Sequence, residues 1–249
     1  MQNARSDSSD LRRLGLDGIL IINVRSFVER RKHIQAQLSK FGLEGEFVHE
    51  FDAADIDKRI DEKYFNGTGL RPTQKSCSLK HIVALERICS RGWRRALILE
   101  DDAVLAENFP GGLKQALIES ARHKCPHVIY LGCGGNQYTP RSQRTPGQYL
   151  YKNNRGRLTD SYVIGIAEAS ARLKWMSANK MDLPIDLAFD AMDRLVGIEI
   201  LWFEDPVVEQ GSKNGAFETT LQPGRTAKMQ RLHFAWKGIW QRHVRQLWR

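Results

Sequence analysis

Short apolar runs alternate with segments of helical periodicity along most of this 249-residue chain, and this alternation constrains the fold more than any other feature. Runs such as ILII and ALIL have the length and composition of buried strands. Residues 26–42 and 73–91 show helical patterns, and Gly42 and Gly92 supply the expected stops. Strands that alternate with helices predict an α/β fold, with a mostly parallel, Rossmann-like sheet and helices on both faces.

The same pattern divides the chain into three parts. Residues 1–16 are polar and predict a flexible N-terminal lead, residues 17–222 predict one α/β domain, and residues 223–249 form a tail. Within the domain, residues 57–72 and 134–159 are rich in polar residues and glycine and predict surface loops, the second of them long or hairpin-like. A hydrophobic fraction of 41% and a charged fraction of 27% are typical of a globular protein.

Cysteine usage and hydropathy indicate the compartment. None of the four cysteines forms a CxxC pair, and no cysteine–histidine spacing is typical of a zinc site. The first residues contain no apolar segment of a signal peptide, and the longest apolar runs are too short to span a bilayer. These features predict a cytoplasmic protein with reduced thiols.

Three consecutive carboxylates, Glu100, Asp101 and Asp102, follow directly after the apolar run of residues 96–99. In open α/β sheets, ligands bind at the carboxyl ends of the strands. A divalent cation such as Mg²⁺ or Mn²⁺ would offset the repulsion between these side chains and could bridge them to substrate phosphates. The alternative is that they are solvated loop charges or helix caps, and the spacing alone leaves both interpretations open.

Five stretches of the sequence occur in an order that carries a resemblance to a known family. They are ILIINVRSFVERR, CSLKHIVALERI, ALILEDDAVL, SYVIGIAEASARL and PIDLAFDAMDRLVGIEILWFEDPVVEQ. Over roughly residues 18–222 the chain resembles glycosyltransferase family 25, the lipopolysaccharide or lipooligosaccharide biosynthesis glycosyltransferases, with collagen galactosyltransferases as relatives. The resemblance implies a GT-A-like fold and an inverting transfer of a hexose, galactose foremost. The donor it implies is a nucleoside-diphosphate sugar, most often UDP-galactose, and the acceptor a lipopolysaccharide or another surface saccharide.

The resemblance also implies a Mn²⁺ or Mg²⁺ ion held by the acidic motif. Asp102 is the foremost ligand candidate and Asp101 the second. Glu100 is assigned the orientation of a substrate hydroxyl or the support of the metal ligands.

Five further residues are assigned to donor binding by their positions in the family's motifs. Asn23 and Arg25 follow the first predicted strand, where such enzymes receive the nucleotide, and Arg30 matches an arginine of the first helix. His81 stands where the family usually has Ser–His, although Lys80 replaces the serine here and could meet a donor phosphate. A lone histidine on a half-apolar helix is also often a core residue, so that alternative stays open.

Inversion requires one general base that takes the proton of the attacking acceptor hydroxyl. Asp186, in the PID stretch, is the leading candidate, and Asp190 lies one helical turn further along. Their i, i+4 spacing places both on one helix face. Asp186 alternatively caps its helix.

The tail carries much of the net charge of +9, because residues 225–249 contain seven basic residues and no acidic one. Wound as a helix, this segment places its tryptophans and aliphatic residues on one side and its arginines on the other. Such a helix predicts binding to an anionic membrane surface, and hence a peripheral location at the inner face of the cytoplasmic membrane. Packing on its own domain and nonspecific binding of nucleic acid are the alternatives.

Two other classes of function remain open from the sequence. A metal-dependent phosphoryl-transfer or hydrolytic enzyme could use the same acidic cluster, and it would require additional convergent carboxylates for a second metal. A noncatalytic basic binding module would depend on the tail alone. No motif of a nucleic-acid-binding fold occurs in the sequence.

Overall fold

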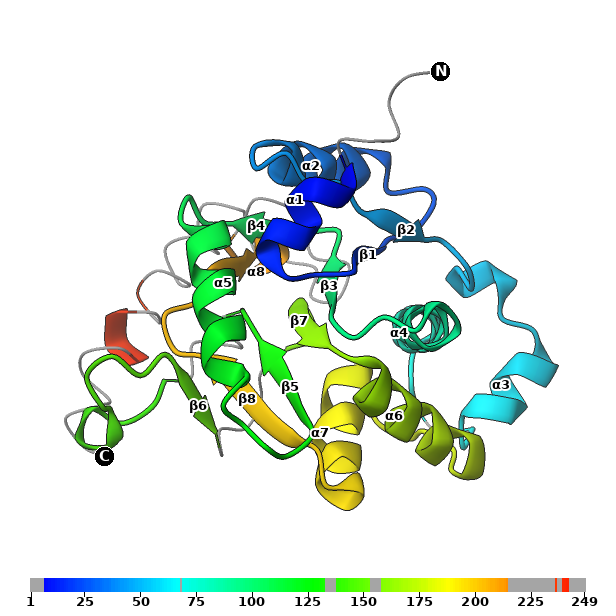
Figure 1. Cartoon of the computed structure of the whole chain (residues 1–249). Helices are drawn as coiled ribbons and strands as arrows, with labels where there is room; N and C mark the ends of the chain where they lie inside the picture. The colour runs from blue at the N-terminus through cyan, green and yellow to red at the C-terminus, as the bar shows by residue number, and fades with distance from the viewer. Residues whose placement is uncertain are drawn as a thin grey trace.

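A seven-stranded sheet forms the centre of the computed structural model, which describes residues 7–67, 69–132, 138–152, 158–214, 236 and 239–241 (Figure 1). The strand order is β2-β1-β3-β7-β5-β8-β6. β2, β1, β3, β5 and β8 point in one direction, whereas β7 and β6 run opposite to their neighbours. The strands are β1 Gly18–Ile22, β2 Glu46–Val48, β3 Ala96–Glu100, β5 His127–Tyr130, β6 Leu150–Lys152, β7 Ser161–Ile164 and β8 Glu199–Phe203.

Helices cover both faces of this sheet. α4, α6 and α7 pack in one apolar cluster, and α2 and α5 pack in the other. Successive residues of β1 point into opposite clusters, Leu20 into the first and Ile21 into the second, as the twofold repeat of a strand requires. The predicted α/β fold, a mostly parallel sheet with helices on both faces, is confirmed. The helices are α1 Asp7–Leu14, α2 Val28–Ser39, α3 Lys58–Tyr64, α4 Pro72–Arg91, α5 Phe109–Ser120, α6 Ile166–Ala178, α7 Ile185–Val196 and α8 Gly211–Asn214.

Part of the predicted loop at residues 57–72 is helical, so that prediction was wrong over α3. The Asp57 side chain accepts a hydrogen bond of 2.8 Å from the backbone N–H of Ile60 and caps the helix. Ile60 and Tyr64 then pack against the core cluster on the side of α4. Their i, i+4 spacing was the sequence signal for this helix.

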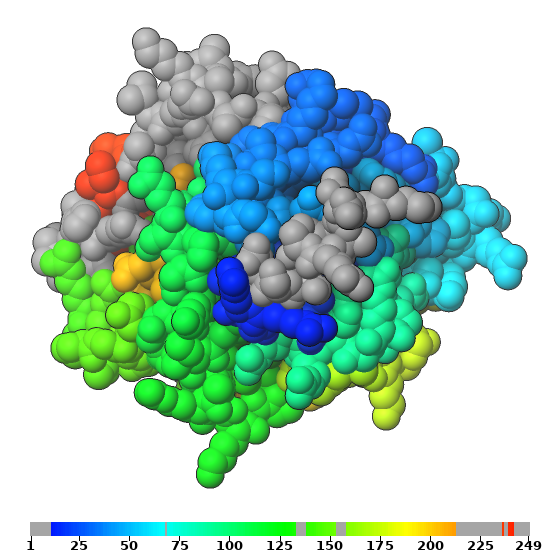
Figure 2. All heavy atoms as spheres, turned by 45° about the horizontal axis from the view of Figure 1, so that its top comes forward, coloured from blue at the N-terminus to red at the C-terminus, as the bar shows by residue number. Residues whose placement is uncertain are grey.

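Residues 7–14, assigned by the sequence to a flexible lead, form α1. Leu11 and Leu14 pack against the same core cluster as α5, and α1 lies beside α5 (Figures 1 and 2). The last turns of this helix therefore contribute apolar contacts to the domain.

Two further differences concern the second half of the chain. The predicted loop of residues 134–159 contains a short 3-10 turn at Arg141–Gln143 and the edge strand β6, while residues 133–137 and 153–157 lie outside the described part. The stretch IEILWFEDPVVEQ, which reads as one strand in the sequence, forms two strands, β8 and β9 (Val208–Gln210). β9 leaves the large sheet and pairs with β4 (Ala103–Leu105) in a small two-stranded sheet.

Most of the predicted C-terminal helix, in residues 223–249, lies outside the described residues. Those described there are Trp236 and residues 239–241, and Trp236, Ile239 and Trp240 expose large apolar side chains. The rings of Trp236 and Trp240 stack with centroids 5.5 Å apart. Among the described helices, none combines the length and the apolar character needed to cross a membrane.

Candidate active site

A pocket opens where β1 and β3 end, at the edge of the sheet where the sequence placed the acidic motif. Chain segments that are far apart in the sequence form it, including the first turn of α8 after β9. Six of the ten predicted site residues line it: Asn23, Arg30, Lys80, Glu100, Asp101 and Asp102. The fold therefore confirms the position of the motif, because neighbouring parallel strands bring their carboxyl ends to one edge.

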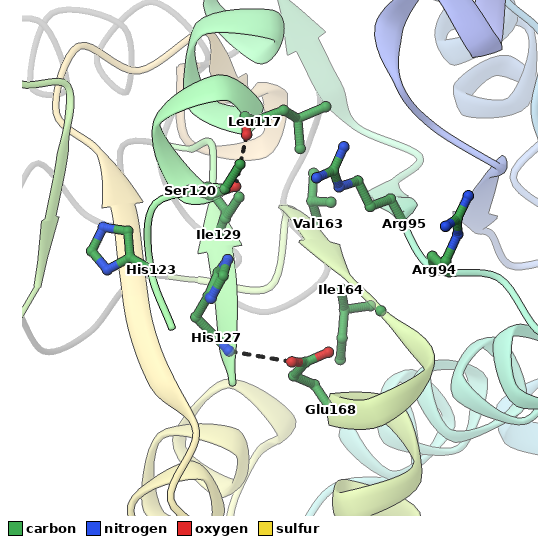
Figure 3. Close-up of a pocket in the computed structure, with 12 residues that line it drawn as sticks. Arg94, Arg95, Leu117, Ser120, His123, His127, Ile129, Val163, Ile164 and Glu168 are labelled. Carbon is green, nitrogen blue, oxygen red and sulfur yellow. Dashed lines mark hydrogen bonds between the residues drawn. The ribbon is translucent and has the colours of Figure 1, made fainter. Parts of the chain in front are cut away.

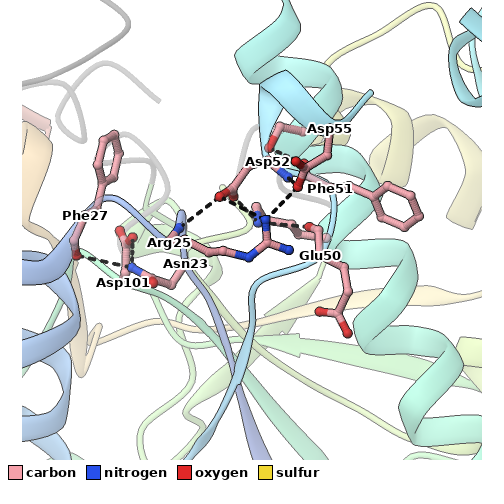
Figure 4. Close-up of polar contacts among 10 residues, drawn as sticks. Asn23, Arg25, Phe27, Glu50, Phe51, Asp52, Asp55 and Asp101 are labelled. Carbon is pink, nitrogen blue, oxygen red and sulfur yellow. Dashed lines mark hydrogen bonds and ion pairs between the residues drawn. The ribbon is translucent and has the colours of Figure 1, made fainter. Parts of the chain in front are cut away.

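Asp101 lies at the floor of the pocket with only 5% of its surface exposed. Asn23 Nδ2 donates a hydrogen bond of 2.8 Å to one carboxylate oxygen (Figure 4), and Arg30 Nη1 lies 3.3 Å from the other. Burial nevertheless raises the pKa of Asp101 to about 6, because the charge–charge attraction of Arg30 and the hydrogen bond from Asn23 only partly offset the loss of solvation. A further positive charge would stabilise its ionised form.

Asp102 is buried and only half satisfied. The backbone N–H of Ser212 donates to Asp102 Oδ2 at 3.1 Å, and the backbone N–H of Gly211 donates to the Asp102 carbonyl at 2.8 Å. Asp102 Oδ1 has no hydrogen-bond partner within the described part of the chain. Burial, followed by the charge of Glu100, raises the pKa of Asp102.

Three buried oxygen atoms around the pocket lack a hydrogen-bond donor among the described residues, and this bears on whether the pocket fits a metal ion. Asn23 Oδ1 and Gln210 Oε1 are also buried without a hydrogen-bond donor among the described residues. Buried polar atoms in native proteins are normally paired, so three unpaired acceptors in one pocket indicate a partner that the described residues do not supply, either water or a cation. Asp101 and Asp102 supply the oxygen ligands that Mg²⁺ and Mn²⁺ prefer, and the acidic pair fits such an ion.

Glu100 is the third carboxylate, and its contacts differ from those of its neighbours. Thr159 Oγ1 donates to Glu100 Oε1 at 3.0 Å, and Gln210 Nε2 lies 3.5 Å from Oε2. His81 Nε2 lies 3.8 Å from Glu100 Oε1. Glu100 thus lies between the pocket and the histidine beneath it.

Lys80 and Arg25 are held by acidic groups that the sequence interpretation missed. The buried Lys80 ammonium donates to the Glu50 carbonyl at 2.9 Å and to Asp52 Oδ1 at 2.7 Å. Arg25 Nη1 forms an ion pair of 2.7 Å with Asp55, and its backbone N–H donates to Asp52 Oδ2 (Figure 4). Lys80 lines the pocket, whereas Arg25 lies outside it with a side chain that is 54% exposed.

The segment that carries Asp52 contains an unusual backbone conformation. Phe51 has a φ of 60°, a left-handed value that is uncommon for a residue with a side chain. The Phe51 carbonyl accepts a hydrogen bond of 2.7 Å from Ser76 Oγ, which helps to hold this turn against α4. The turn brings the Glu50 carbonyl and the Asp52 carboxylate to the same ammonium group, which no short sequence pattern reveals.

The two candidate bases on α7 occupy different environments. Asp190 accepts two hydrogen bonds from Arg194 Nη2, at 2.9 and 2.8 Å. Asp186 lies half-buried in the first turn of α7, near enough to Cys77 that its charge contributes to the raised pKa of that thiol. Neither aspartate is among the residues that line the pocket.

His81 lies beneath the pocket and is completely buried. Its Nδ1 is 3.0 Å from the hydroxyl of Tyr162, and its ring packs against Tyr162 and Phe189. The sequence allowed both a core role and a site role for this residue. The structure is consistent with both roles, because one edge of the ring packs in the core and the other edge faces Glu100.

A second pocket lies at the opposite edge of the sheet, at the amino ends of β3 and β5 (Figure 3). Its walls include Arg94, Arg95, His127 and Glu168, together with apolar side chains from β5, β7 and α5. It contains none of the predicted site residues.

A buried acidic pocket at the carboxyl ends of an α/β sheet defines a class of protein that binds ligands at this edge. Comparison with known proteins identifies the family within that class. The family model described as glycosyltransferase family 25 (LPS biosynthesis protein) matches residues 16–154, more than half of the chain. The chain belongs to glycosyltransferase family 25, as its motifs predicted.

Individual relatives are more distant. The human protein named inactive glycosyltransferase 25 family member 3 is 25% identical over 191 residues, which cover 70% of this chain and 31% of that protein. The mouse protein of the same name is 23% identical over 192 residues, covering 71% and 32%. The chain therefore spans about a third of the length of these relatives.

Solved structures show only a loose likeness. A glycosyltransferase involved in glycosylation of the major capsid of PBCV-1 has a TM-score of 0.46 and 6% identity, covering 88% of this chain and 98% of that chain. A Drosophila β-1,4-galactosyltransferase 7 in complex with manganese, UDP-galactose and xylobiose has a TM-score of 0.43 and 11% identity, covering 86% and 78%.

Proposed function

We propose that this protein is a metal-dependent, inverting glycosyltransferase that moves a hexose from a UDP-sugar to a lipopolysaccharide or another surface saccharide. Family membership supports the reaction class. The observation that carries the proposal is Asp102 Oδ1, a buried carboxylate oxygen without a hydrogen-bond partner in the described structure, in a pocket where the carboxyl ends of two strands meet. UDP-galactose is the first donor to test.

Asp101 and Asp102 would hold the Mn²⁺ or Mg²⁺ ion. When bound, the ion supplies a positive charge that stabilises the diphosphate leaving group. Arg30 lines the same pocket, and its guanidinium carbon lies 5.1 Å from the centroid of the Phe27 ring. Its positive charge at this position is suited to pair with a donor phosphate. Asn23 fixes the orientation of Asp101 through its hydrogen bond.

Asp186 is the proposed general base, which takes the proton of the acceptor hydroxyl as that oxygen attacks the sugar. Asp186 is preferred to Asp190 because its charge acts on Cys77, which lines the pocket, whereas Asp190 forms an ion pair with Arg194. Glu100 is proposed to orient the acceptor hydroxyl, because it lines the pocket and is itself positioned by Thr159.

Donor binding provides the direct test. We expect UDP to raise the melting temperature only when Mn²⁺ is present, and GDP and CMP to have smaller effects, because a ligand that binds the folded state stabilises it. Asp102→Asn should remove the shift, whereas Glu168→Gln, in the pocket at the opposite edge, should retain it. A metal-dependent shift that persists in Asp102→Asn would contradict the assignment. Release of UDP from UDP-galactose in the presence of acceptor then separates an active enzyme from a family member that only binds donor.

The rival phosphoryl-transfer or hydrolytic function requires more carboxylates than the pocket provides. Among the described residues that line it, the carboxylates are the three of the acidic motif. A centre that holds two Mg²⁺ or Mn²⁺ ions would require carboxylates beyond these three, so the glycosyltransferase remains the better supported function.

Membrane attachment through the tail completes the proposal. Trp236, Ile239 and Trp240 expose large apolar side chains, and residues 225–249 carry seven basic residues and no acidic one. These features support a peripheral location at the inner face of the cytoplasmic membrane. We expect the full chain to float with anionic liposomes, and the double variant Trp236→Ala/Trp240→Ala to bind them more weakly. Equal flotation of both proteins would exclude this role of the tryptophans.

A further inference from the structure

We propose that Cys77, His81 and Glu100 form a second cation site, beside the Asp101–Asp102 pair and specific for a softer transition metal such as Zn²⁺. Each residue offers one ligand atom, a thiol sulfur, an imidazole nitrogen and a carboxylate oxygen, and these atoms all lie within 4.8 Å of one another. This inference concerns a metal of a different class from the Mn²⁺ or Mg²⁺ of the proposed reaction.

The fold brings the three ligands together from two elements. Cys77 and His81 are four positions apart on α4, which places them on the same side of that helix. Glu100 ends β3 and faces them, with its Oε1 3.8 Å from His81 Nε2. Two ligands of a tetrahedral zinc ion with bonds of about 2.1 Å lie about 3.4 Å apart, so a shift of a few tenths of an ångström would bring this pair into range.

The orphaned nitrogen of His81 points to a missing ligand. The residue is completely buried, and its Nε2 has no hydrogen-bond partner among the residues the structure describes. Its other ring nitrogen lies 3.0 Å from the Tyr162 hydroxyl, which can accept the Nδ1 proton and leave the Nε2 lone pair directed at Glu100. Metal-binding histidines characteristically hold their second nitrogen on such a partner. Thr159 supports Glu100 in the same way.

The charges around Cys77 attract a dication. Burial raises the pKa of the Cys77 thiol well above its usual value, and the carboxylates of Glu100, Asp186, Asp101 and Asp102 raise it further. These charges oppose an isolated thiolate but attract Zn²⁺, which displaces the thiol proton when it binds. A thiolate and an imidazole select Zn²⁺ over Mg²⁺, whereas the neighbouring aspartates offer only oxygen ligands.

The proposed ion would be open to ligands from the pocket. Cys77 and Glu100 both line the pocket, while His81 approaches from beneath. Three protein ligands leave a fourth tetrahedral position, as in zinc sites that bind water or another ligand. Occupancy would also engage the carboxylate of Glu100, so we expect added Zn²⁺ to inhibit transferase activity.

Cobalt spectroscopy of the full chain tests the site without reference to catalysis. After chelation and removal of the chelator, we expect Co²⁺ to produce a cobalt–thiolate charge-transfer band that saturates at a single equivalent and that Zn²⁺ displaces. Cys77→Ser should abolish the band. Cys89→Ser is the matched control, because Cys89 is a half-buried thiol on the same helix whose sulfur contacts the Ile166 carbonyl at 3.9 Å, and this variant should retain the band.

Two further variants distinguish this site from the donor site. Asp101→Asn should retain the cobalt–thiolate band while it loses the Mn²⁺-dependent shift with UDP. Tyr162→Phe removes the hydroxyl behind His81 and should weaken Co²⁺ binding by about 10-fold or more. A wild-type protein without the band, or a Cys77→Ser protein that keeps it, would overturn the proposal. Neither result would affect the test of donor binding.

Discussion

The two pockets lie at opposite edges of one sheet, and they differ in how their charged groups are satisfied. At the carboxyl edge, Asp101 and Asp102 are buried, and Asp102 keeps an oxygen without a partner in the described structure. At the amino edge, Glu168 accepts a hydrogen bond of 3.3 Å from the backbone N–H of His127, while Arg94 is exposed and Arg95 is half-buried (Figure 3). Of these two described pockets, the one at the carboxyl edge holds buried carboxylates that a cation would stabilise, and carboxylates with raised pKa values are enriched at functional sites.

The largest expected effect is the fall in kcat when the proposed general base is replaced. Asp186→Asn removes the proposed base, and we expect kcat to fall by about 10²–10⁴-fold with little change in UDP affinity. Asp190→Asn on the same helix face is the control and should have a smaller effect, since Asp190 is already paired with Arg194. Equal losses in both variants would contradict the assignment of Asp186. Steady-state kinetics with UDP-galactose, combined with a binding titration of UDP, would measure both quantities.

The raised pKa of Asp101 at the carboxyl edge should make the stability of the protein depend on pH. The pKa of Asp101 is about 6 in the folded protein and near 3.8 without the fold. The folded state therefore binds this proton more tightly, and the metal-free protein should lose up to about 3 kcal/mol of unfolding free energy from this group as pH rises from about 4 to 6. Urea denaturation in a chelator should show this trend for the wild type relative to Asp101→Asn. Parallel curves for the two proteins would show that Asp101 titrates normally.

At the amino edge, we expect a change in packing to lower the stability of the fold without changing donor binding. A Cβ added at Gly165 would lie 2.5 Å from the backbone carbonyl oxygen of Arg94. Gly165→Ala should therefore destabilise the fold by about 1–3 kcal/mol and leave the Mn²⁺-dependent shift with UDP unchanged. Gly111→Ala on α5 is the control, because a Cβ there meets open space, and it should be neutral or slightly stabilising. Thermal melts of both variants, with and without UDP and Mn²⁺, would measure these effects.

The smallest effect is expected for the charges of the amino-edge pocket. Arg94→Gln and Arg95→Gln should change stability by less than about 0.5 kcal/mol, because these side chains are exposed or half-buried at the rim. Their UDP affinities and kcat should match the wild type. A loss of donor affinity in either variant would show that the two edges are coupled and would break the contrast between them.

Much of the fold could be predicted from local patterns. β1 and β3 are continuous apolar runs that are buried on both faces, and α4 ends at Gly92, whose φ of 66° suits a glycine. The patterns failed where local signals were weak, as in α3, or where one apparent strand serves two sheets, as in β8 and β9. Which sheet a strand joins depends on its hydrogen bonds to strands that are distant in the sequence, and the periodicity of a segment does not indicate which strand it pairs with.

The candidate site residues also divide into those that local sequence patterns mark and those that only tertiary contacts bring into place. The acidic motif, Asn23 and Arg30 were predicted from strand ends and family motifs, and the structure brings them into one pocket. Asp52 was missed, because its contact with Lys80 depends on the left-handed turn at Phe51. The proximity of Cys77 to Glu100 likewise depends on the approach of α4 to β3. Asp190 shares the predicted helix face with Asp186, and the structure adds that Arg194 binds both carboxylate oxygens of Asp190.

The sequence by itself determined the α/β alternation, the family and the place of three carboxylates at a strand end, since each is written in contiguous residues. Only the tertiary structure decided which of those carboxylates are buried, which oxygen atoms lack a donor among the described residues, and which cations are already paired. The physical reason is that solvation and charge pairing depend on distances between segments remote in sequence. Asp101, for example, is held by Asn23 and Arg30, more than 70 residues away along the chain.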